Sequence, residues 1–471
     1  MQQNTLNCER EDLMKKELFE EYSIPRAITA LALPTILGML VTVFYNMADT
    51  FFVGKTNDAR QMASVVLIFP IFMMLMAFGN IFGIGGGTYI SRLMGIKEYK
   101  KAKNVSSLCF FACIGVGVLI SIAIFLFMDG VLHLMGSTET TYFYAKGYLS
   151  IIALGAPFIC LQQALGQIIR AEGAARSSMV GMMIGTVINI ILDPIMILSL
   201  DMGVVGAAIA TVIGNMFSVI YYVYYLRKKS NVLSIALKDF KATGEIIKEI
   251  LMIGIPVFVN NILFSISNMV LNNFISGYGE TVVSSMGIPH RINSFPVMIM
   301  IGLSQGIQPF IGYNFAAKNY KRMNSAIKFS TLCSVVCGTI ITAVFYWGAG
   351  DFVKIFMNDP EIVETGSRFL KIIASPVPIL GIQFIFMGAF QAMGKAVPAL
   401  VLSICRQGVL FIPALIIGRR LFGLNGIIWG QPVADFFTIV LSVVLYIIVY
   451  RSIMKTKLPK KDISCGIMNA V

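Results

Sequence analysis

Residues 95–102 read GIKEYKKA, and residues 316–323 read AAKNYKRM, 221 positions later (316 − 95). The same shift places 148–157 (YLSIIALGAP) over 369–378 (FLKIIASPVP). Both copies of the repeat lie among long apolar runs. Two similar apolar halves are typical of membrane carriers, which place substrate and ion sites within or between pseudo-symmetric bundles. The repeat therefore predicts one bundle of helices for each half of the chain.

The composition indicates an integral membrane protein. It has 471 residues, of which 57% are hydrophobic and 13% are charged, and its mean hydropathy is +0.79. A soluble globular domain carries about 25% charged residues. The net charge of +13 arises from Lys and Arg in short connections between apolar runs, as the positive-inside rule describes. We therefore expect the lipid bilayer as a partner and no nucleic acid.

The sequence carries no motif for catalysis or for a metal centre. Six of the eight cysteines lie in apolar segments, where Cys behaves as a small hydrophobe. The pairs Cys109/Cys113 and Cys333/Cys337 have the ordinary spacing of a helix face, and no His accompanies them. The run GIGGG at 83–87 lacks the Lys-Ser/Thr of a phosphate loop. We expect no disulfide framework, no metal centre, no cofactor and no enzymatic activity.

Long apolar runs with a helical period set the fold class. A transmembrane helix needs about 20 apolar residues, and these runs are too long for the strands of a barrel. We predict an all-α integral membrane protein with twelve transmembrane helices arranged as two pseudo-symmetric six-helix bundles. The predicted spans are 27–53, 62–90, 105–128, 142–168, 177–200 and 203–226 in the first half, and 247–275, 281–313, 326–347, 369–392, 397–417 and 423–450 in the second.

Lys and Arg fix the orientation, because they gather in alternate connections. The basic connections follow the second, sixth and eighth predicted spans, and the tail after the twelfth is also basic. Both termini are therefore expected in the cytoplasm. An even number of spans places both halves the same way up, as a parallel repeat. The predicted parts are a cytoplasmic N-terminal segment (1–26), a first bundle (27–226), a cytoplasmic linker (227–246), a second bundle (247–450) and a cytoplasmic tail (451–471).

Few ionisable side chains lie inside the predicted spans. Asp49 lies near the end of the first span, and Asp193 is the only charge in the fifth. Asn189 precedes Asp193 by one helical turn, and Pro194 should bend the helix at this point. At about 1.5 Å per residue, Asp49, Asp193 and Thr211 lie about 6, 10 and 12 Å from the outer ends of their spans. These side chains therefore fall in one layer of the first bundle.

Asp49, Asn189, Asp193 and Thr211 are our candidate cation-coupling residues. Charged groups in lipid are costly, and they commonly mark ion or proton pathways. Carboxylate, amide and hydroxyl oxygens suit a hard cation such as Na⁺, and a pair of carboxylates suits H⁺. The alternative is that Asp49 caps its helix at the outer interface while Asp193 hydrogen-bonds a neighbouring helix.

The second half lacks these carboxylates. Asp49 maps to Leu271 (49 + 222) and Asp193 maps to Ala414 (193 + 221). One acid remains in the twelfth span, Asp435, and Arg406 in the eleventh span is a candidate partner. Asp435 can serve either as one half of a structural ion pair or as a substrate group. The candidate residues of a substrate cavity are Tyr45, Asn46, Gln163, Asn268, Asn272, Gln305 and Asp435.

Several segments resemble one transporter family. They are ALPTILGMLVTVFYNMADTFFVG (32–54), GGGTYISRLMGIKEYKKA (85–102), NIILDPIMIL (189–198), GVVGAAIATVIG (203–214), IGYNFAAKNYKRM (311–323) and FGLNGIIWGQPVADFF (422–437). In order and spacing they resemble the multidrug and toxic compound extrusion (MATE) transporters, and the second-half segments resemble its bacterial MepA-like branch. The resemblance runs from about residue 26 to residue 450.

The resemblance implies two six-helix lobes around a central cavity. It also implies export of amphipathic, mostly cationic drugs across the bacterial cytoplasmic membrane by a monomer, in exchange for H⁺ or Na⁺. The family's cation site corresponds to Asp49, Asn189, Asp193 and Thr211. Some branches use acids on their seventh and tenth helices, which this chain lacks. Two alternatives are a lipid or lipid-linked precursor flippase of the same superfamily and a membrane enzyme or receptor without transport.

Overall fold

The computed structural model describes residues 17–56, 58–357 and 359–455. Residues 1–16 of the predicted N-terminal segment and 456–471 of the predicted tail lie outside this range. Within the described ranges, every regular element is a helix. The helical period of the sequence therefore predicts the fold class correctly.

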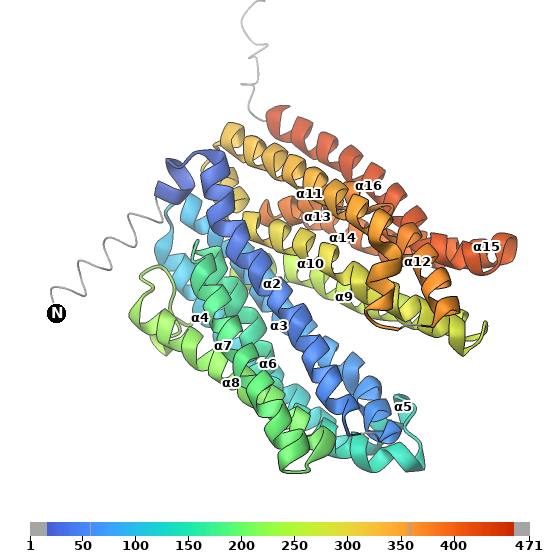
Figure 1. Ribbon diagram of the computed structural model, residues 1–471. Coiled ribbons are helices and arrows are strands. Elements are labelled where there is room, and N and C mark those ends of the chain that lie inside the picture. The colour runs from blue at the N-terminus through green and yellow to red at the C-terminus, as the bar shows by residue number, and fades with distance from the viewer. Residues whose placement is uncertain (1–16, 57, 358, 456–471) are drawn as a thin grey trace, which may run out of the picture.

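The first bundle is built from helices α2 to α8, and the second from helices α9 to α16 (Figure 1). The first contains α2 (Ile24–Gly54), α3 (Ala59–Gly95), α4 (Tyr99–Leu126), α5 (Met128–Leu134), α6 (Glu139–Ala171), α7 (Ala175–Asp193), the π-helix η1 (Pro194–Ser199) and α8 (Gly203–Lys228). The connection holds the short 3₁₀-helix η2 (Leu237–Asp239). The second contains α9 (Gly244–Ser276), α10 (Glu280–Ala316), α11 (Tyr320–Lys354), α12 (Pro360–Ala374), α13 (Val377–Ala392), α14 (Ala396–Ile404), the π-helix η3 (Cys405–Leu410), α15 (Phe411–Phe422) and α16 (Leu424–Lys455).

Two of the expected straight spans are interrupted. In the described residues, eleven helices are long and apolar enough to cross a membrane, or twelve if α12 and α13 form one span with a 44° bend. The bend falls at the sequence SPVP (375–378), where two prolines lack the N–H that a continuous helix needs. The expected span 397–417 is a composite of α14, η3 and α15.

The two bundles meet mainly where α2 and α3 of the first lie against α9 and α10 of the second. Helix α2 packs against α10, and α3 packs against α9. Glycines allow the close approach, because a Cβ at Gly306 would lie 2.6 Å from the Cα of Ala32, and a Cβ at Gly254 would lie 2.6 Å from the Ile81 carbonyl oxygen. The bundles lie together at the end that carries the described N-terminal residues and diverge toward the other end (Figure 1).

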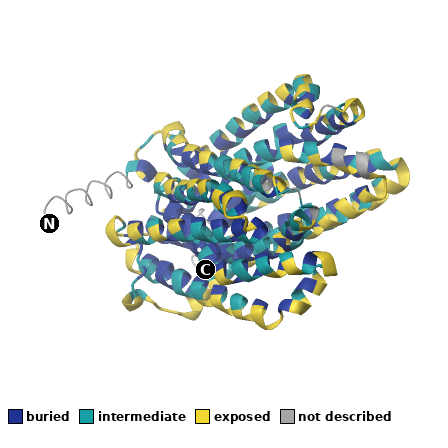
Figure 2. Ribbon diagram, turned by 60° about the horizontal axis from the view of Figure 1, so that its bottom comes forward, coloured by how far each residue is buried: buried dark blue, intermediate teal, exposed yellow. Residues whose placement is uncertain are grey.

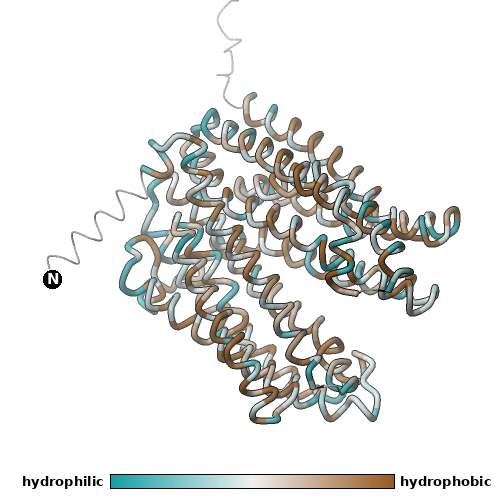
Figure 3. Tube along the Cα trace, in the orientation of Figure 1, coloured by the Kyte–Doolittle hydropathy of each residue, from teal (hydrophilic) through white to brown (hydrophobic). Residues whose placement is uncertain are grey.

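Apolar side chains cover the outside of both bundles. Figure 2 shows buried residues concentrated where helices face one another, with exposed residues on the outer faces and loops. Many of the exposed residues are large and apolar, including Leu119 and Trp347, which are 66% and 86% exposed. Figure 3 shows hydrophobic residues along the helices and hydrophilic ones gathered in connections. Such a surface is suited to lipid rather than to water.

Candidate functional site

Thr211 of α8 joins three helices at the predicted cation site. The hydroxyls of Tyr45 on α2 and Thr211 lie 3.3 Å apart. The Asn189 side-chain amide on α7 donates to the Thr211 hydroxyl oxygen at 3.4 Å. Asn189 and Thr211 are 2% and 5% exposed. The structure thus brings together Tyr45, Asn189 and Thr211, which lie far apart in the sequence.

Asp49 and Asp193 add two carboxylates to this group. Asp49 lies one turn beyond Tyr45 on α2, and Asp193 is the last residue of α7. The two carboxylates are close enough for their charges to interact. Within the described residues, Asp49 Oδ1, both Asp193 oxygens and Asn189 Oδ1 are buried and accept no hydrogen bond. Buried acceptors without donors are costly, so this cluster of oxygens suits H⁺ or a hard cation.

A π-helix follows Asp193 directly. Pro194 has no N–H to continue the α-helical pattern, and the chain forms η1 from Pro194 to Ser199 before it turns into α8. The sequence predicted a bend at Pro194, and the structure has a π-helix there. Single π-turns inside helices are frequent at functional sites because they shift the side chains around them.

Tyr148 is a neighbour of the two carboxylates that the sequence did not reveal. It lies on α6, it is 8% exposed, and it is close enough to Asp49 and Asp193 for electrostatic interaction. A tyrosine within an apolar helix gives no charge or motif signal. Its proximity to the carboxylates depends on how α6 packs within the bundle.

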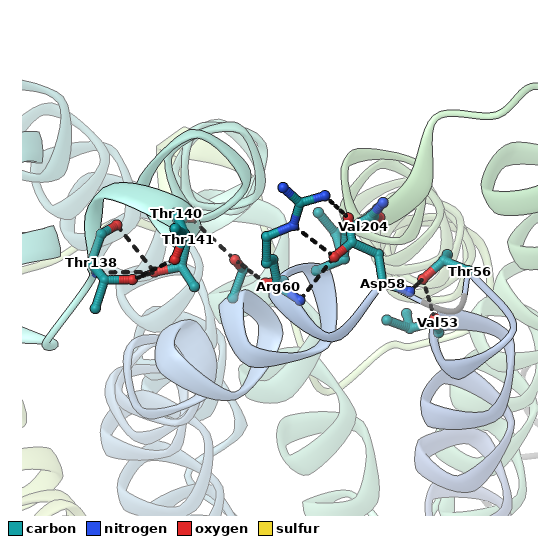
Figure 4. A network of polar contacts seen from close by, with 10 residues as sticks. Val53, Thr56, Asp58, Arg60, Thr138, Thr140, Thr141 and Val204 are labelled. Carbon is teal, nitrogen blue, oxygen red and sulfur yellow. Dashed lines mark hydrogen bonds and ion pairs between the residues drawn. The ribbon is translucent and has the colours of Figure 1, made fainter.

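A polar network lies around the α2–α3 connection of the same bundle (Figure 4). Asp58 accepts from the backbone N–H of Arg60 at 3.0 Å and pairs with its guanidinium at 3.0 Å. The hydrogen bonds from Arg60 hold the pKa of Asp58 at about 2. Gln61 accepts from the Val204 N–H at 3.0 Å, which joins α3 to the start of α8. The network therefore fixes the α2–α3 connection to α8 beyond the carboxylates.

The two predicted cavity glutamines, Gln163 and Gln305, make different contacts. The Gln163 amide on α6 donates to Asn80 Oδ1 on α3 at 3.0 Å, inside the first bundle. Gln305 of α10 accepts from Arg170 at 2.6 Å and from Gln167 at 3.0 Å, across the boundary between bundles. Their role in a substrate cavity stays a prediction.

The predicted cavity asparagines lie on α9 and α2. Asn268 of α9 donates to the Phe264 carbonyl of its own helix at 2.8 Å, and Asn272 is exposed one turn later. The side chain of Asn46 lies outside the described residues. A role in substrate binding stays a prediction for these asparagines.

Asp435 forms an ion pair inside the second bundle. Arg406 Nε donates to Asp435 Oδ1 at 2.9 Å, and the Gln431 amide donates to the same oxygen at 2.9 Å. The carboxylate side chain is 3% exposed. The pairing of Asp435 with Arg406 that the sequence suggested is therefore confirmed.

Comparison with known proteins places this geometry in a family. The MatE family model matches residues 34–195 and again 256–417, two stretches 222 positions apart (256 − 34). The chain belongs to the MatE family. Asp49, Asn189 and Asp193 fall within the first match, and Leu271 and Ala414 fall within the second. Both bundles thus match the family, although only one of them carries the acidic cluster.

Relatives of this MatE chain include characterised bacterial proteins and solved structures. The chain is 38% identical over 418 residues to the "Multidrug export protein MepA" of Staphylococcus aureus (strain NCTC 8325 / PS 47), covering 88% of this chain and 92% of that one. It is 36% identical over 417 residues to the protein of the same name from Staphylococcus saprophyticus, with the same coverage. Among solved structures, the "outward-facing conformation of a multidrug resistance MATE family transporter of the MOP superfamily" has a TM-score of 0.88, 25% identity, and coverage of 93% of this chain and 98% of that one.

Proposed function

We propose that this MatE chain is a multidrug exporter of the bacterial cytoplasmic membrane, with both termini in the cytoplasm, coupled to the inward movement of H⁺ or Na⁺. The names of its relatives, multidrug export proteins at 36–38% identity over most of the chain, support drug export rather than a flippase. The expected substrates are amphipathic, mostly cationic small molecules.

One observation carries the coupling proposal: buried oxygens of Asp49, Asn189 and Asp193 accept no hydrogen bond from the described residues. The two carboxylates are also close enough for their charges to interact. A proton or Na⁺ would supply the missing positive charge. The neighbouring hydroxyls of Tyr45 and Thr211 could orient around the bound ion. For coupling, the ion must bind one conformation more tightly than the other.

Helix α2 connects this site to the boundary between bundles. It carries Tyr45 and Asp49 toward its outer end, and Ala32 lies against Gly306 of α10 nearer its start. Pro34 interrupts the hydrogen bonding of the helix between these points. A shift of α2 on ion binding would therefore change the packing between bundles and the shape of the space where they diverge. We propose this movement as the route by which the ion expels the drug.

Reconstituted protein tests the coupling directly. Proteoliposomes loaded with ethidium are given an inward H⁺ gradient or an inward Na⁺ gradient in separate runs. We expect one of the gradients to drive efflux, which would identify the ion. Folded protein that exports ethidium under neither gradient, in either orientation, would contradict the antiport mechanism.

A further inference from the structure

Asp435 in the second bundle is paired with a positively charged side chain of the same protein, Arg406. Asp435 Oδ1 accepts hydrogen bonds from Arg406 and Gln431, both at 2.9 Å. The Arg406 side chain is 14% exposed and that of Asp435 is 3% exposed. The arginine is therefore the more accessible partner, and it covers the acid.

Contacts from two other helices hold Arg406 in this position. Its guanidinium lies over the Phe384 ring of α13, with the central carbon 4.9 Å from the ring centroid, a favourable cation–π arrangement. Arg406 belongs to the π-helix η3, and the Ser267 hydroxyl of α9 donates to the neighbouring Gln407 carbonyl at 2.7 Å. The side chain is thus fixed at the carboxylate rather than free to move away from it.

The first bundle has no equivalent of this pair. A shift of 221 places Gly185 at the position of Arg406 (406 − 185), and a shift of 220 places Asn215 at the position of Asp435 (435 − 215). A Cβ at Gly185 would lie 2.6 Å from the Gly214 carbonyl oxygen, so α7 and α8 are packed too closely there for an arginine. The ion pair is therefore a feature of the second bundle and not of the repeated fold.

We infer that Arg406 is a specificity-determining residue: it occupies Asp435 as a tethered counter-ion and keeps organic cations and coupling ions from binding there. This inference rests on the proposed cation transport. Two charges that satisfy each other inside a protein present no net charge to a ligand. Without Arg406, Asp435 would be a buried, unpaired acid of the kind that recruits a cation in the first bundle. The second bundle thus contains a latent site for an organic monocation.

The test measures binding of tetraphenylphosphonium to purified full-length protein by calorimetry, in a background where D49N and D193N neutralise the first bundle. In that background we expect R406Q to raise the affinity about tenfold, in line with the coupling of close charge pairs. Adding D435N should remove the gain, and R406K, which keeps the charge, should not produce it. A structural role alone would not strengthen binding.

Two outcomes would overturn the inference: R406Q leaves the affinity unchanged, or the gain persists when D435N is added. If R406Q does not fold, D435N in the wild-type protein gives a second measurement. It leaves Arg406 unpaired and should weaken tetraphenylphosphonium binding, and unchanged binding would also overturn the inference. The proposed function fails separately, if wild-type protein in proteoliposomes exports ethidium under neither the H⁺ nor the Na⁺ gradient.

Discussion

The two bundles share one fold but differ in whether their buried acids are paired with a basic side chain. In the first, Asp49 and Asp193 lie close together, and buried oxygens of both accept no hydrogen bond from the described residues. In the second, Asp435 is neutralised by Arg406 at 2.9 Å. The backbone repeat thus supplies two similar frameworks, and the side chains decide which of them buries acids that accept no hydrogen bond from the described residues.

The second bundle fills the position of one missing acid, Asp49, with a packed apolar side chain. Leu271, the counterpart of Asp49, is 4% exposed and belongs to a core cluster with Ile275, Phe369 and Leu415. A carboxylate placed there would be desolvated without a partner, at a high cost in free energy. The asymmetry between the bundles is therefore built into their cores.

The largest expected effect comes from neutralising the acids of the first bundle. D49N and D193N keep the side-chain shape but remove the charge, so ion coupling should be lost and the initial rate of gradient-driven ethidium efflux should fall at least about tenfold. D201N, at an exposed position in the connection before α8, is the matched control and should transport normally. If D49N or D193N exported ethidium at the wild-type rate while present in the membrane in wild-type amounts, the proposal that the acids of the first bundle couple efflux to the ion would be contradicted.

A second, smaller effect should follow from blocking the contact between bundles. G306L places a side chain where a Cβ would already lie 2.6 Å from the Cα of Ala32. By analogy with overpacked cores, we expect a loss of about 1–3 kcal/mol from the bundle contact, measured as a lower Tm in detergent. G287L on the same helix is the control, since no described atom lies within 4 Å of its Cβ position. Equal Tm values for both variants would contradict the close packing.

Much of this arrangement could be predicted from the sequence, and the reasons differ by feature. The length of the apolar runs and their helical period indicate the membrane spans, because a backbone that crosses lipid must satisfy its hydrogen bonds within a helix. Asp49 and Asp193 stand out because charge in an apolar run is rare. Tyr148 could not be found this way, since its role depends on which face of α6 meets the acids. The break between α12 and α13 was also missed, although the prolines at 376 and 378 were a visible signal.

A third prediction tests whether Tyr148 contributes to the acidic site that distinguishes the first bundle from the second. Y148F removes the hydroxyl beside the two acids and leaves the packing of the ring in place. We expect the hydroxyl to contribute about 1 kcal/mol to binding of the coupling ion, so its loss should reduce ion-coupled efflux about fivefold without abolishing it. The control is Y142F on the same helix, whose hydroxyl contacts the exposed Asp129 at the outer end. If Y148F exports ethidium at the wild-type rate, the site is confined to the residues that the sequence identified.

The smallest effect concerns two helix N-caps, one in each bundle. Asp58 caps α3 and also pairs with Arg60, whereas Asp359 caps α12 by accepting backbone N–H groups at 3.0 and 3.2 Å. Asn is a good helix cap, so D58N should lose the ion pair and keep the cap. Exposed pairs contribute little to stability, and we expect D58N to lower Tm slightly at neutral pH and D359N to lower it less.

The pH dependence of this difference follows from the pKa of Asp58, which Arg60 holds at about 2. An unfolded Asp has a pKa of about 3.9. A folded pKa below the unfolded one stabilises the folded state above the unfolded pKa, and this contribution disappears as the pH falls through the folded pKa. The Tm gap between wild type and D58N should therefore be constant near neutral pH and close between about pH 4 and pH 2. A gap that stayed constant across this interval would show that the Asp58–Arg60 pair does not hold the outer end of the first bundle.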